Sequence, residues 1–287
     1  MLSIIVINYK TFEYTKRCID SIIVHTKKTP YEIILIDNFS DDGSAEKLSK
    51  LFPTITHIHN KENQGFAKGN NTGIAASKGE YILLLNSDTE LTEDSISYCL
   101  NNIKNNPKNI VSCKLIHPNN QIQHQCSKFP SISLNLIEFF RIHKTWKKNK
   151  VGKTLLSSYF NHMTYCEPDW IWGTFFMFKK SHLSRLTENK LNDDFFMYGE
   201  DMKWCYDFKN IGCKIVYLPN TEIIHFIGKS SNNSTLKNKS IVKNEIQFIK
   251  ITNGNLYSII YKLVRILNLL STFRIDNFKF AFLYLRA

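Results

Sequence analysis

Polar and acidic residues follow three apolar runs in the first 88 residues of the chain. They are Asn8-Tyr9, Asp37-Asn38 and Asn86-Ser87-Asp88. A single Asp or Asn after a strand is most often a turn residue. Three such groups together favour a ligand site, because the carboxyl ends of parallel strands share one edge of a sheet, where open α/β sheets bind their ligands. The spacing therefore predicts a binding site that carries carboxylates.

A second acidic group stands at the start of a predicted helix. Glu200 and Asp201 follow Gly199, and the helix continues to Asn210 and ends at Gly212. A carboxylate in the first turn of a helix is stabilised as the anion by the helix dipole. We therefore expect these carboxylates to stay ionised at neutral pH, as a general base or a metal ligand must.

Strand-like and helix-like segments alternate through residues 1–88. Strands are expected at 2–7, 31–37, 55–58 and 81–85, and helices at 15–23, 45–51 and 66–76, the last with Gly79 as a left-handed cap. This order predicts an α/β fold with a mostly parallel sheet and helices on both faces. Farther along, Thr92 is expected to cap a helix that reaches Ile103, and strands are expected at 110–116 and 121–125. Residues 131–160 show no clear periodicity.

Composition and cysteine usage set the class of the protein. Of 287 residues, 43% are apolar and 22% are charged, which excludes wholesale disorder and a fibrous repeat. Seven scattered cysteines without a C-x-x-C pair indicate neither a disulfide framework nor a zinc ribbon, and fit a reducing compartment. No secretory leader and no membrane-spanning run is expected. The prediction is a cytoplasmic globular protein.

The net charge of +12 suggests an anionic partner, and much of it lies near the C-terminus. From Lys229 to Arg286 there are ten basic and two acidic residues, among apolar pairs at near-helical spacing between Leu256 and Leu270. Such a segment suits a helix on an anionic membrane surface. It equally suits a helix packed on its own domain with a solvated basic face, and both interpretations stay open.

Two common nucleotide-binding motifs are absent from the sequence. The turn after the first strand is Asn8-Tyr9-Lys10-Thr11, without the glycines of a dinucleotide fingerprint. No G-x-x-x-x-G-K-[ST] segment occurs either. NAD-dependent redox chemistry and a Walker-type NTPase are therefore disfavoured.

Six blocks of the sequence, in order, resemble family 2 glycosyltransferases with the GT-A fold. The blocks are 4–9, 36–44, 63–71, 84–89, Asp169-Trp170 with Gly173, and 193–201 followed by His225, Gly228 and Ser230. They cover about residues 1–231 and are most similar to the rhamnosyltransferase-like branch that works on bacterial surface polysaccharides. The resemblance implies a catalytic domain at 1–230, with a nucleotide-sugar-binding half at 1–104 and an acceptor and catalytic half at 105–230. Residues 231–287 would form a basic amphipathic helical segment.

The resemblance also implies a donor site. Tyr9 would pack beside the base, and Asp37 would accept a hydrogen bond from the pyrimidine N–H, which uracil and thymine offer and cytosine does not. Residues Gly65–Asn70 would wrap the nucleotide, with Lys68 as a phosphate contact. The expected donor is a UDP- or dTDP-sugar.

Asn86-Ser87-Asp88 matches the family's metal motif, usually Asp-x-Asp, with Asn in its first position. Asn86 would then bind the ribose, while Asp88 supplies a single carboxylate to Mg²⁺ or Mn²⁺. His225 falls where the family often has a further ligand, although a histidine in such an apolar segment is by itself more often a core residue. The ion would neutralise the departing nucleoside diphosphate.

Catalytic and acceptor-side roles follow from the same resemblance. Asp201 matches the family's catalytic base, which removes the proton of the acceptor hydroxyl in an inverting displacement. Glu200 would orient the acceptor or Asp201. Trp170, Trp172 and Gly173 would line the acceptor side, or else the two Trp residues pack in the core. The acceptor is expected to be a glycan, lipid-linked if the C-terminal segment binds the inner membrane surface.

Three other functions stay open at this stage. An inactive relative would bind the donor without transfer. A nucleotidyltransferase would share the sheet, but such enzymes usually carry a glycine-rich basic loop after the first strand. A nucleic-acid or anion-binding module fits the basic pI, but Asp37, Asp88 and Asp201 would repel phosphates, so no nucleic-acid partner is expected.

Overall fold

The computed structural model describes residues 1–227 and 234–287, and the chain divides into two compact units. Unit 1 comprises Met1–Cys126 and Asn161–Ser230, and unit 2 comprises Ser127–Phe160 and Ser231–Ala287. Gly228 and Ser230, which belong to the last block of the resemblance, lie outside the described residues. All seven cysteines are free, as their spacing predicts.

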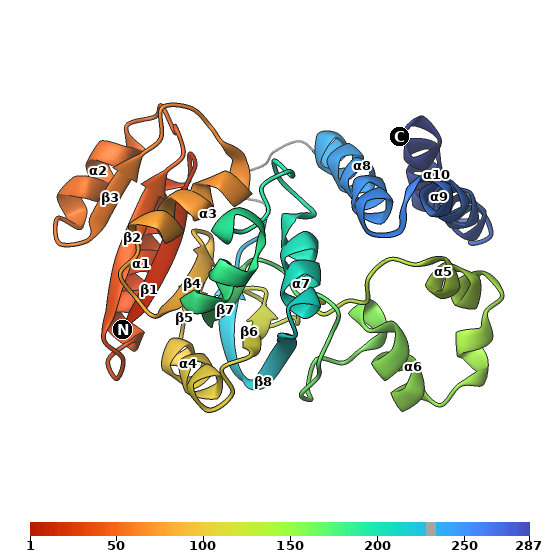
Figure 1. Ribbon diagram of the computed structural model, residues 1–287, viewed down its shortest axis with the longest axis horizontal. Coiled ribbons are helices and arrows are strands. Elements are labelled where there is room, and N and C mark those ends of the chain that lie inside the picture. Colours follow the sequence, from red (N-terminus) through yellow and green to blue (C-terminus); the bar gives the residue numbers. More distant parts are fainter. Residues whose placement is uncertain (228–233) are drawn as a thin grey trace. The chain divides into compact units, whose positions relative to one another are not determined.

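Unit 1 is built on one sheet of eight strands (Figure 1). The strands are β1 (Leu2–Asn8), β2 (Tyr31–Asp37), β3 (Thr56–His59), β4 (Tyr81–Asn86), β5 (Thr89–Leu91), β6 (Asn109–Ile116), β7 (Phe175–Lys179) and β8 (Lys214–His225). Their order across the sheet is β3-β2-β1-β4-β7-β6-β8-β5. Strands β1 to β4 run parallel, as the sequence predicts, whereas β7 is antiparallel to both of its neighbours and β5 is antiparallel to β8. The complete sheet is therefore mixed.

Helices cover both faces of this sheet. They are α1 (Phe12–His25), α2 (Ser44–Leu51), α3 (Gly65–Ala76), α4 (Ser95–Asn105) and α7 (Glu200–Asn210), with short 3-10 turns η3 (Lys180–Arg185) and η4 (Thr187–Asn189). Alternate residues of a strand point to opposite faces. Ile4 accordingly joins a core cluster with residues of α1 and α4, while Ile5 faces Gly73 of α3, where an added Cβ would lie 2.5 Å from Ile5. Phe176 of β7 contacts Trp204 of α7 on that second face.

The structure corrects two expected helix caps. Gly79 is not in the left-handed region and does not cap α3; an added Cβ there would lie 2.6 Å from the backbone nitrogen of Ser3, so glycine allows two backbones to approach. Thr92 does not cap α4. That role belongs to Asp94, whose carboxylate accepts a hydrogen bond of 3.1 Å from the amide of Ser97.

The strand expected at 121–125 does not form. The segment makes one bridge, between Ile116 and Ile122, with two backbone hydrogen bonds, from the amide of His117 to the carbonyl of Gln121 and from the amide of Gln123 to the carbonyl of Leu115. The side-chain amides of Gln123 and Gln125 also donate to main-chain carbonyls of β6, so side chains supply part of the bonding that a strand would make through its backbone.

Unit 2 is helical. Its elements are α5 (Ile132–Phe139), η1 (Ile142–Thr145), α6 (Lys148–Leu155), η2 (Ser157–Tyr159), α8 (Ser234–Asn253), α9 (Asn255–Leu270) and α10 (Ile275–Arg286). Helix α9 packs against α5, α8 and α10. No helix in the described part of the chain is long and apolar enough to span a bilayer.

Candidate active site

The ends of β1 and β2 are joined by a buried polar network around Asp37. Asn8 Nδ2 lies 2.7 Å from Asp37 Oδ1, 2.9 Å from Ser40 Oγ and 2.8 Å from Ser44 Oγ. Ser40 donates its hydroxyl to Asp37 Oδ1 and its amide to Oδ2, at 2.5 and 3.1 Å. The pairing of Asn8 with Asp37 in the parallel register brings these groups together. The single hydrogen bond that the structure shows on Oδ2 uses one of that oxygen's two lone pairs.

Asn38, the next residue, organises the loop that leads into α3. Its Nδ2 donates to Asn63 Oδ1 at 2.9 Å, and its Oδ1 accepts from Asn60 Nδ2 at 2.9 Å and from the amide of Gln64 at 3.2 Å. A buried amide with both ends satisfied fixes the loop in one conformation. The start of α3 is therefore held beside the end of β2.

Gly65 begins α3 at a point where no other residue fits. Its φ is +78°, and an added Cβ would lie 2.3 Å from the carbonyl oxygen of Phe196. The next amide, that of Phe66, donates to the same oxygen at 2.9 Å. Gly65 thus joins the first turn of α3 to the segment that precedes Glu200 and Asp201.

Strand pairing brings together Asp88 and His225, which are far apart in the sequence. Antiparallel β5 and β8 pair Thr89 with His225, and the amide of Phe226 donates to the carbonyl of Asp88 at 2.9 Å. Asp88 Oδ1 consequently lies 3.3 Å from His225 Nε2, and both side chains are buried.

Gln123 determines which nitrogen of His225 carries the proton. Its Nε2 donates to the carbonyls of His225 and Ile116, at 2.7 and 3.3 Å, so the opposite end of the amide is the acceptor oxygen. That oxygen lies 2.8 Å from His225 Nδ1. Nδ1 must therefore be the donor. In its neutral form, His225 then presents the lone pair of Nε2 beside Asp88.

Three consecutive residues, 172–174, link these groups to the start of α7. The ring centroid of Trp172 lies 6.5 Å from that of His225. The amide of Gly173 donates to Asp201 Oδ2 at 3.2 Å. The carbonyl of Thr174 accepts from the amide of Asn86 at 3.0 Å. The segment therefore ties the end of β4, the histidine of β8 and the acidic start of α7 to one place.

Asp201 and Glu200 have different environments. Asp201 is half-buried and accepts hydrogen bonds from the amides of Gly173 and Met202, at 3.2 and 2.8 Å. Burial nevertheless outweighs these bonds and raises the pKa of Asp201 to about 6. Glu200 is buried, its Oε2 has no partner among the described residues, and burial together with the charge of Asp201 raises its pKa well above the usual range. A pKa of about 6 leaves Asp201 ionised at neutral pH, whereas the more complete burial of Glu200 works against its charged form.

The remaining predicted residues lie at the margins of this arrangement. Tyr9 directly follows β1, is half-buried, and has Lys10 Nζ 5.7 Å from its ring centroid. Lys68 is exposed within the first turns of α3. Trp170 is half-buried just before the linking segment, while Trp172 packs partly against the core. Core packing and acceptor contact are thus both available to Trp172.

Sequence reasoning missed several residues that position this site. Gln123 falls in a segment expected to be a strand, Thr174 carries no motif, and Asn8 was singled out only as a strand-end residue. Spacing offers no signal for Gln123, because the two contacts that define its role lie 102 residues away at His225.

The side chains of Asp88 and His225 could supply part of the coordination of a hard divalent cation. Asp88 supplies a carboxylate oxygen and His225 an oriented imidazole nitrogen, an oxygen and nitrogen pair that Mg²⁺ and Mn²⁺ accept. Within residues 1–227 and 234–287, no three His, Cys, Asp or Glu side chains gather closely enough to hold a metal ion. An ion here would therefore take its remaining ligands from water or from a bound molecule.

Comparison with known proteins agrees with this arrangement. Residues 3–185 match the family model described as glycosyl transferase family 2. Rhamnosyltransferase WbbL of Escherichia coli strain K12 is 25% identical over 236 residues, covering 79% of this chain and 83% of the relative. Glycosyltransferase GlyG of Streptococcus pneumoniae serotype 4 is 29% identical over 114 residues, covering 39% of this chain. That match spans only 38% of the length of GlyG.

Two solved structures share the fold. One is GalNAc-T7 with UDP, GalNAc and Mn²⁺, with a TM-score of 0.61, 14% identity and coverage of 88% of this chain and 48% of the other. The second is the mannosyltransferase PcManGT of Pyrobaculum calidifontis with GDP-Man and Mn²⁺, with a TM-score of 0.60, 15% identity and coverage of 99% and 74%. These likenesses confirm the expected GT-A fold, with its mixed sheet and surrounding helices.

Proposed function

The chain belongs to glycosyl transferase family 2, and from that premise we propose that it is an inverting, metal-dependent glycosyltransferase. It moves a sugar from a UDP- or dTDP-sugar to a hydroxyl of a lipid-linked glycan during bacterial surface polysaccharide synthesis. The observation that carries this proposal is the linking segment 172–174, which connects the Asp88 and His225 pair with Asp201. The similarity to a rhamnosyltransferase over 79% of the chain supports the substrate class.

The nucleotide would bind at the ends of β1, β2 and β4. Asp37 is held by Asn8 and Ser40, and the second lone pair of Oδ2 is suited to accept the ring N–H of uracil or thymine. Tyr9 would pack beside the base, and Asn86 would bind the ribose. Gly65 and the exposed Lys68 stand at the start of α3, where we place the phosphates.

Asp88 and His225 would hold Mg²⁺ or Mn²⁺ together with the phosphate oxygens of the donor. When bound, the ion supplies positive charge that stabilises the departing nucleoside diphosphate. The protein's own contribution is orientation, since Gln123 keeps the lone pair of His225 Nε2 directed beside Asp88. Both solved neighbours contain Mn²⁺, which supports this assignment.

Asp201 would act as the general base. It accepts the proton of the acceptor hydroxyl while the hydroxyl oxygen bonds to the anomeric carbon, and the bond from that carbon to the diphosphate oxygen breaks. Attack opposite the leaving group inverts the anomeric configuration. A pKa of about 6 leaves the carboxylate ionised at pH 7 and more basic than an ordinary Asp. Glu200 would orient Asp201, and Trp170, Trp172 and Gly173 would border the acceptor.

The location that fits a lipid-linked acceptor is the inner face of the bacterial plasma membrane. The enzyme would act there as a cytoplasmic peripheral protein, in contact with the bilayer through its basic C-terminal segment. The wider class of nucleotidyltransferases and nucleic-acid modules is disfavoured by the family membership. An inactive relative is disfavoured by the presence of Asp88, His225 and Asp201 together.

A donor screen tests the proposal. Purified protein is melted with UDP-, dTDP-, GDP- and CMP-sugars, with Mn²⁺ or with EDTA, and the responding donor is then incubated with a short glycan acceptor. We expect a metal-dependent rise in melting temperature with a UDP- or dTDP-sugar and an inverted product. Stabilisation by the donor without any transfer would indicate the inactive relative. No response to any donor would refute the assigned site.

A further inference from the structure

Helix α9 of unit 2 buries several polar side chains and exposes most of its large apolar ones. The buried side carries the polar residues Ser258, Tyr261 and Asn268 together with Ile266 and Leu269, and the half-buried Arg265 lies beside them. A helix that packs on its own domain normally shows the opposite pattern, with apolar residues inside. The arrangement of α9 therefore indicates that its outer face meets something other than water.

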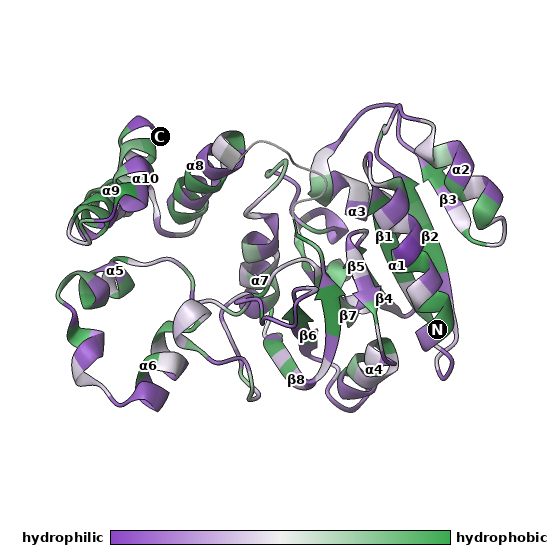
Figure 2. Ribbon diagram, turned by 180° about the vertical axis from the view of Figure 1, so that it is seen from behind, coloured by the Kyte–Doolittle hydropathy of each residue, from purple (hydrophilic) through white to green (hydrophobic). Residues whose placement is uncertain are grey.

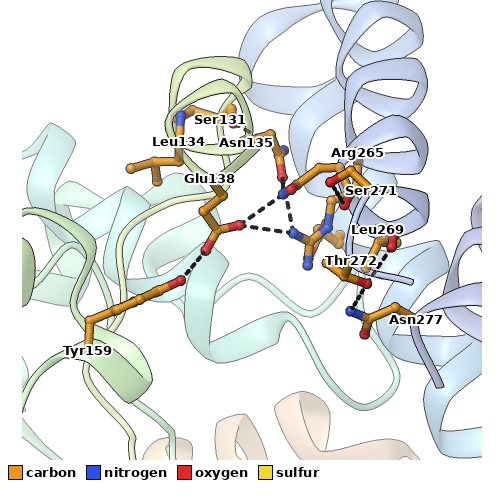
Figure 3. A network of polar contacts seen from close by, with 12 residues as sticks. Ser131, Leu134, Asn135, Glu138, Tyr159, Arg265, Leu269, Ser271, Thr272 and Asn277 are labelled. Atoms are coloured by element: carbon orange, nitrogen blue, oxygen red, sulfur yellow. Dashed lines mark hydrogen bonds and ion pairs between the residues drawn. The ribbon is translucent and has the colours of Figure 1, made fainter. Parts of the chain in front are cut away.

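The buried side is fixed by a network with α5 (Figure 3). Glu138 Oε2 accepts from Asn268 Nδ2 at 2.9 Å and lies 3.8 Å from Arg265 Nη1, and Asn135 Oδ1 accepts from that Arg265 nitrogen at 3.0 Å. Helix α9 is also tied to α8 and α10, because Glu245 of α8 accepts hydrogen bonds from the hydroxyls of Tyr261 and Tyr284. Turning α9 to bury its apolar side would leave these charges without partners, at a large cost in free energy.

The exposed side is a continuous stripe of leucine and isoleucine. Its members are Leu256, Ile259, Ile260, Leu263, Leu267 and Leu270, each between 36% and 73% exposed. Their spacing of three or four residues places them on one face of the helix. The stripe runs the whole 16 residues of α9, which is roughly 24 Å. In Figure 2 the α9 ribbon is accordingly coloured largely as hydrophobic.

Unit 2 also holds all of the protein's excess positive charge. It contains 16 Lys and Arg against three Asp and Glu, a formal charge of +13, while the residues of unit 1 sum to −1. Two of the three acids, Glu138 and Glu245, are engaged in the buried network. The cations that are exposed in unit 2 include Lys144, Lys147, Lys148, Lys150, Lys153, Arg274, Lys279 and Arg286.

We propose that the α9 stripe docks on an anionic lipid bilayer, with its Leu and Ile side chains in the acyl boundary and the lysines and arginines of unit 2 on the headgroups. Sixteen residues are too few to span the hydrocarbon core, so α9 lies in the plane of the interface. A second copy of the chain fits less well, because it would bring two units of +13 together. The inference rests on the membrane location proposed above, but not on the donor or the chemistry.

Vesicle binding of the full-length protein tests this surface. Partition onto vesicles of phosphatidylcholine mixed with phosphatidylglycerol is compared for the wild type, for Leu263→Ser/Leu267→Ser, and for Ile23→Ser/Val24→Ser. The last pair is also exposed and apolar but lies on α1 of unit 1. We expect the α9 variant to lose partition by about tenfold or more, with the α1 variant unchanged, and binding to weaken in high salt and on pure phosphatidylcholine.

Two further readings separate the causes of failure. Equal partition of all three proteins would overturn the proposal, and so would a wild type that sediments as a dimer without lipid and becomes monomeric in the α9 variant. Donor binding and transfer to a soluble acceptor are measured on the same proteins. A wild type that transfers sugar but does not bind vesicles refutes the docking surface alone, whereas a wild type that binds vesicles but responds to no donor refutes the proposed chemistry alone. Because both substituted leucines are exposed, their urea midpoints should match the wild type.

Discussion

The backbone amide of Gly173 donates a hydrogen bond of 3.2 Å to Oδ2 of Asp201. An added Cβ on residue 173 would press on the ring of Phe66 at 3.2 Å and would lie at ordinary contact distance, 3.5 Å, from Asp201 Cβ. The flanking residues of the same segment reach His225 and Asn86. One short stretch of backbone therefore positions the proposed base relative to the proposed metal ligands.

Replacing Asp201 with Asn should separate catalysis from binding. With Asp201 as the base, Asp201→Asn should lower kcat by about 10²-fold or more while the affinity for the donor changes little. Glu13→Gln, an exposed carboxylate in the first turn of α1, is the matched control and should behave as wild type. A fall in donor affinity equal to the fall in kcat would contradict the assignment.

The same substitution should stabilise the folded protein at neutral pH. The pKa of Asp201 is raised to about 6, above its unfolded value. Ionisation of this carboxylate therefore lowers the free energy of unfolding increasingly between about pH 4 and pH 6, fully above pH 6, and not at all below about pH 4. Asp201→Asn should accordingly raise the free energy of unfolding by up to about 3 kcal/mol at pH 7.5. This gain should vanish near pH 4, as measured by urea denaturation at both values. A gain that persists at pH 4 would assign it to some other cause.

Activity should follow the ionisation of Asp201. We expect kcat/KM to rise about tenfold per pH unit on the acidic side and to level off above a midpoint near pH 6. Donor binding measured across the same range serves as the control, since it should not share this midpoint. A limb centred near pH 4 would show that the base is a carboxylate with an ordinary environment.

Gln123 should control the tautomer of His225. In Gln123→Leu the acceptor for Nδ1–H is lost, and we expect ¹⁵N NMR of the metal-free protein to show a shift away from the Nδ1–H form. Affinity for Mn²⁺ should fall about 10- to 100-fold. Gln123→Glu, which retains an acceptor, should keep the tautomer.

Gln125→Leu is the control for the same loop, because Gln125 contacts Ser112 and Cys113 but not His225. An Nε2–H tautomer in the wild type would overturn this account of Gln123 at once. An equal loss of Mn²⁺ affinity in the Gln125 variant would assign the effect to the loop as a whole.

Gly65 and Gly43 make a matched pair for testing the start of α3. Both have positive φ, +78° and +74°, but an added Cβ meets Phe196 at Gly65 and open space at Gly43. Gly43→Ala should cost about 1–2 kcal/mol of folding free energy from backbone strain alone. Gly65→Ala should cost more, by urea denaturation, and should weaken donor binding. Equal costs would show that the backbone around Phe196 moves readily to make room for the added methyl group.

The local sequence pattern was sufficient to predict many of the strands and helices. The apolar runs predict β1, β2, β4 and β6, and the helical spacing predicts α1, α3 and α9, because in these segments the burial period and the secondary structure agree. The predictions that Gly79 caps α3 and Thr92 caps α4 were wrong for a different reason. Both residues are of types that often cap helices. Gly79, however, is glycine because the backbone of Ser3 approaches it closely, and the cap of α4 is the carboxylate of Asp94.

The site itself could be predicted only in part. Asp37, Asp88 and Asp201 are visible as acids at element ends, but the approach of His225 to Asp88 depends on the pairing of β5 with β8, which no local pattern encodes. The raised pKa of Asp201 likewise arises from burial, against the helix-terminus effect that the sequence suggests. The inverted orientation of α9 was not foreseen, because periodicity finds the apolar stripe without telling which side is buried.

The most direct test of the central claim is metal-dependent donor binding through Asp88. Calorimetry compares binding of the responding UDP- or dTDP-sugar with Mn²⁺ and with EDTA, for the wild type, Asp88→Asn and Asp94→Asn. The last is the control, since Asn can still cap α4. We predict that the wild type binds about tenfold or more tightly with Mn²⁺, that Asp88→Asn loses this difference, and that Asp94→Asn keeps it. Equal affinity with and without metal, or an unaltered metal effect in Asp88→Asn, would contradict the account.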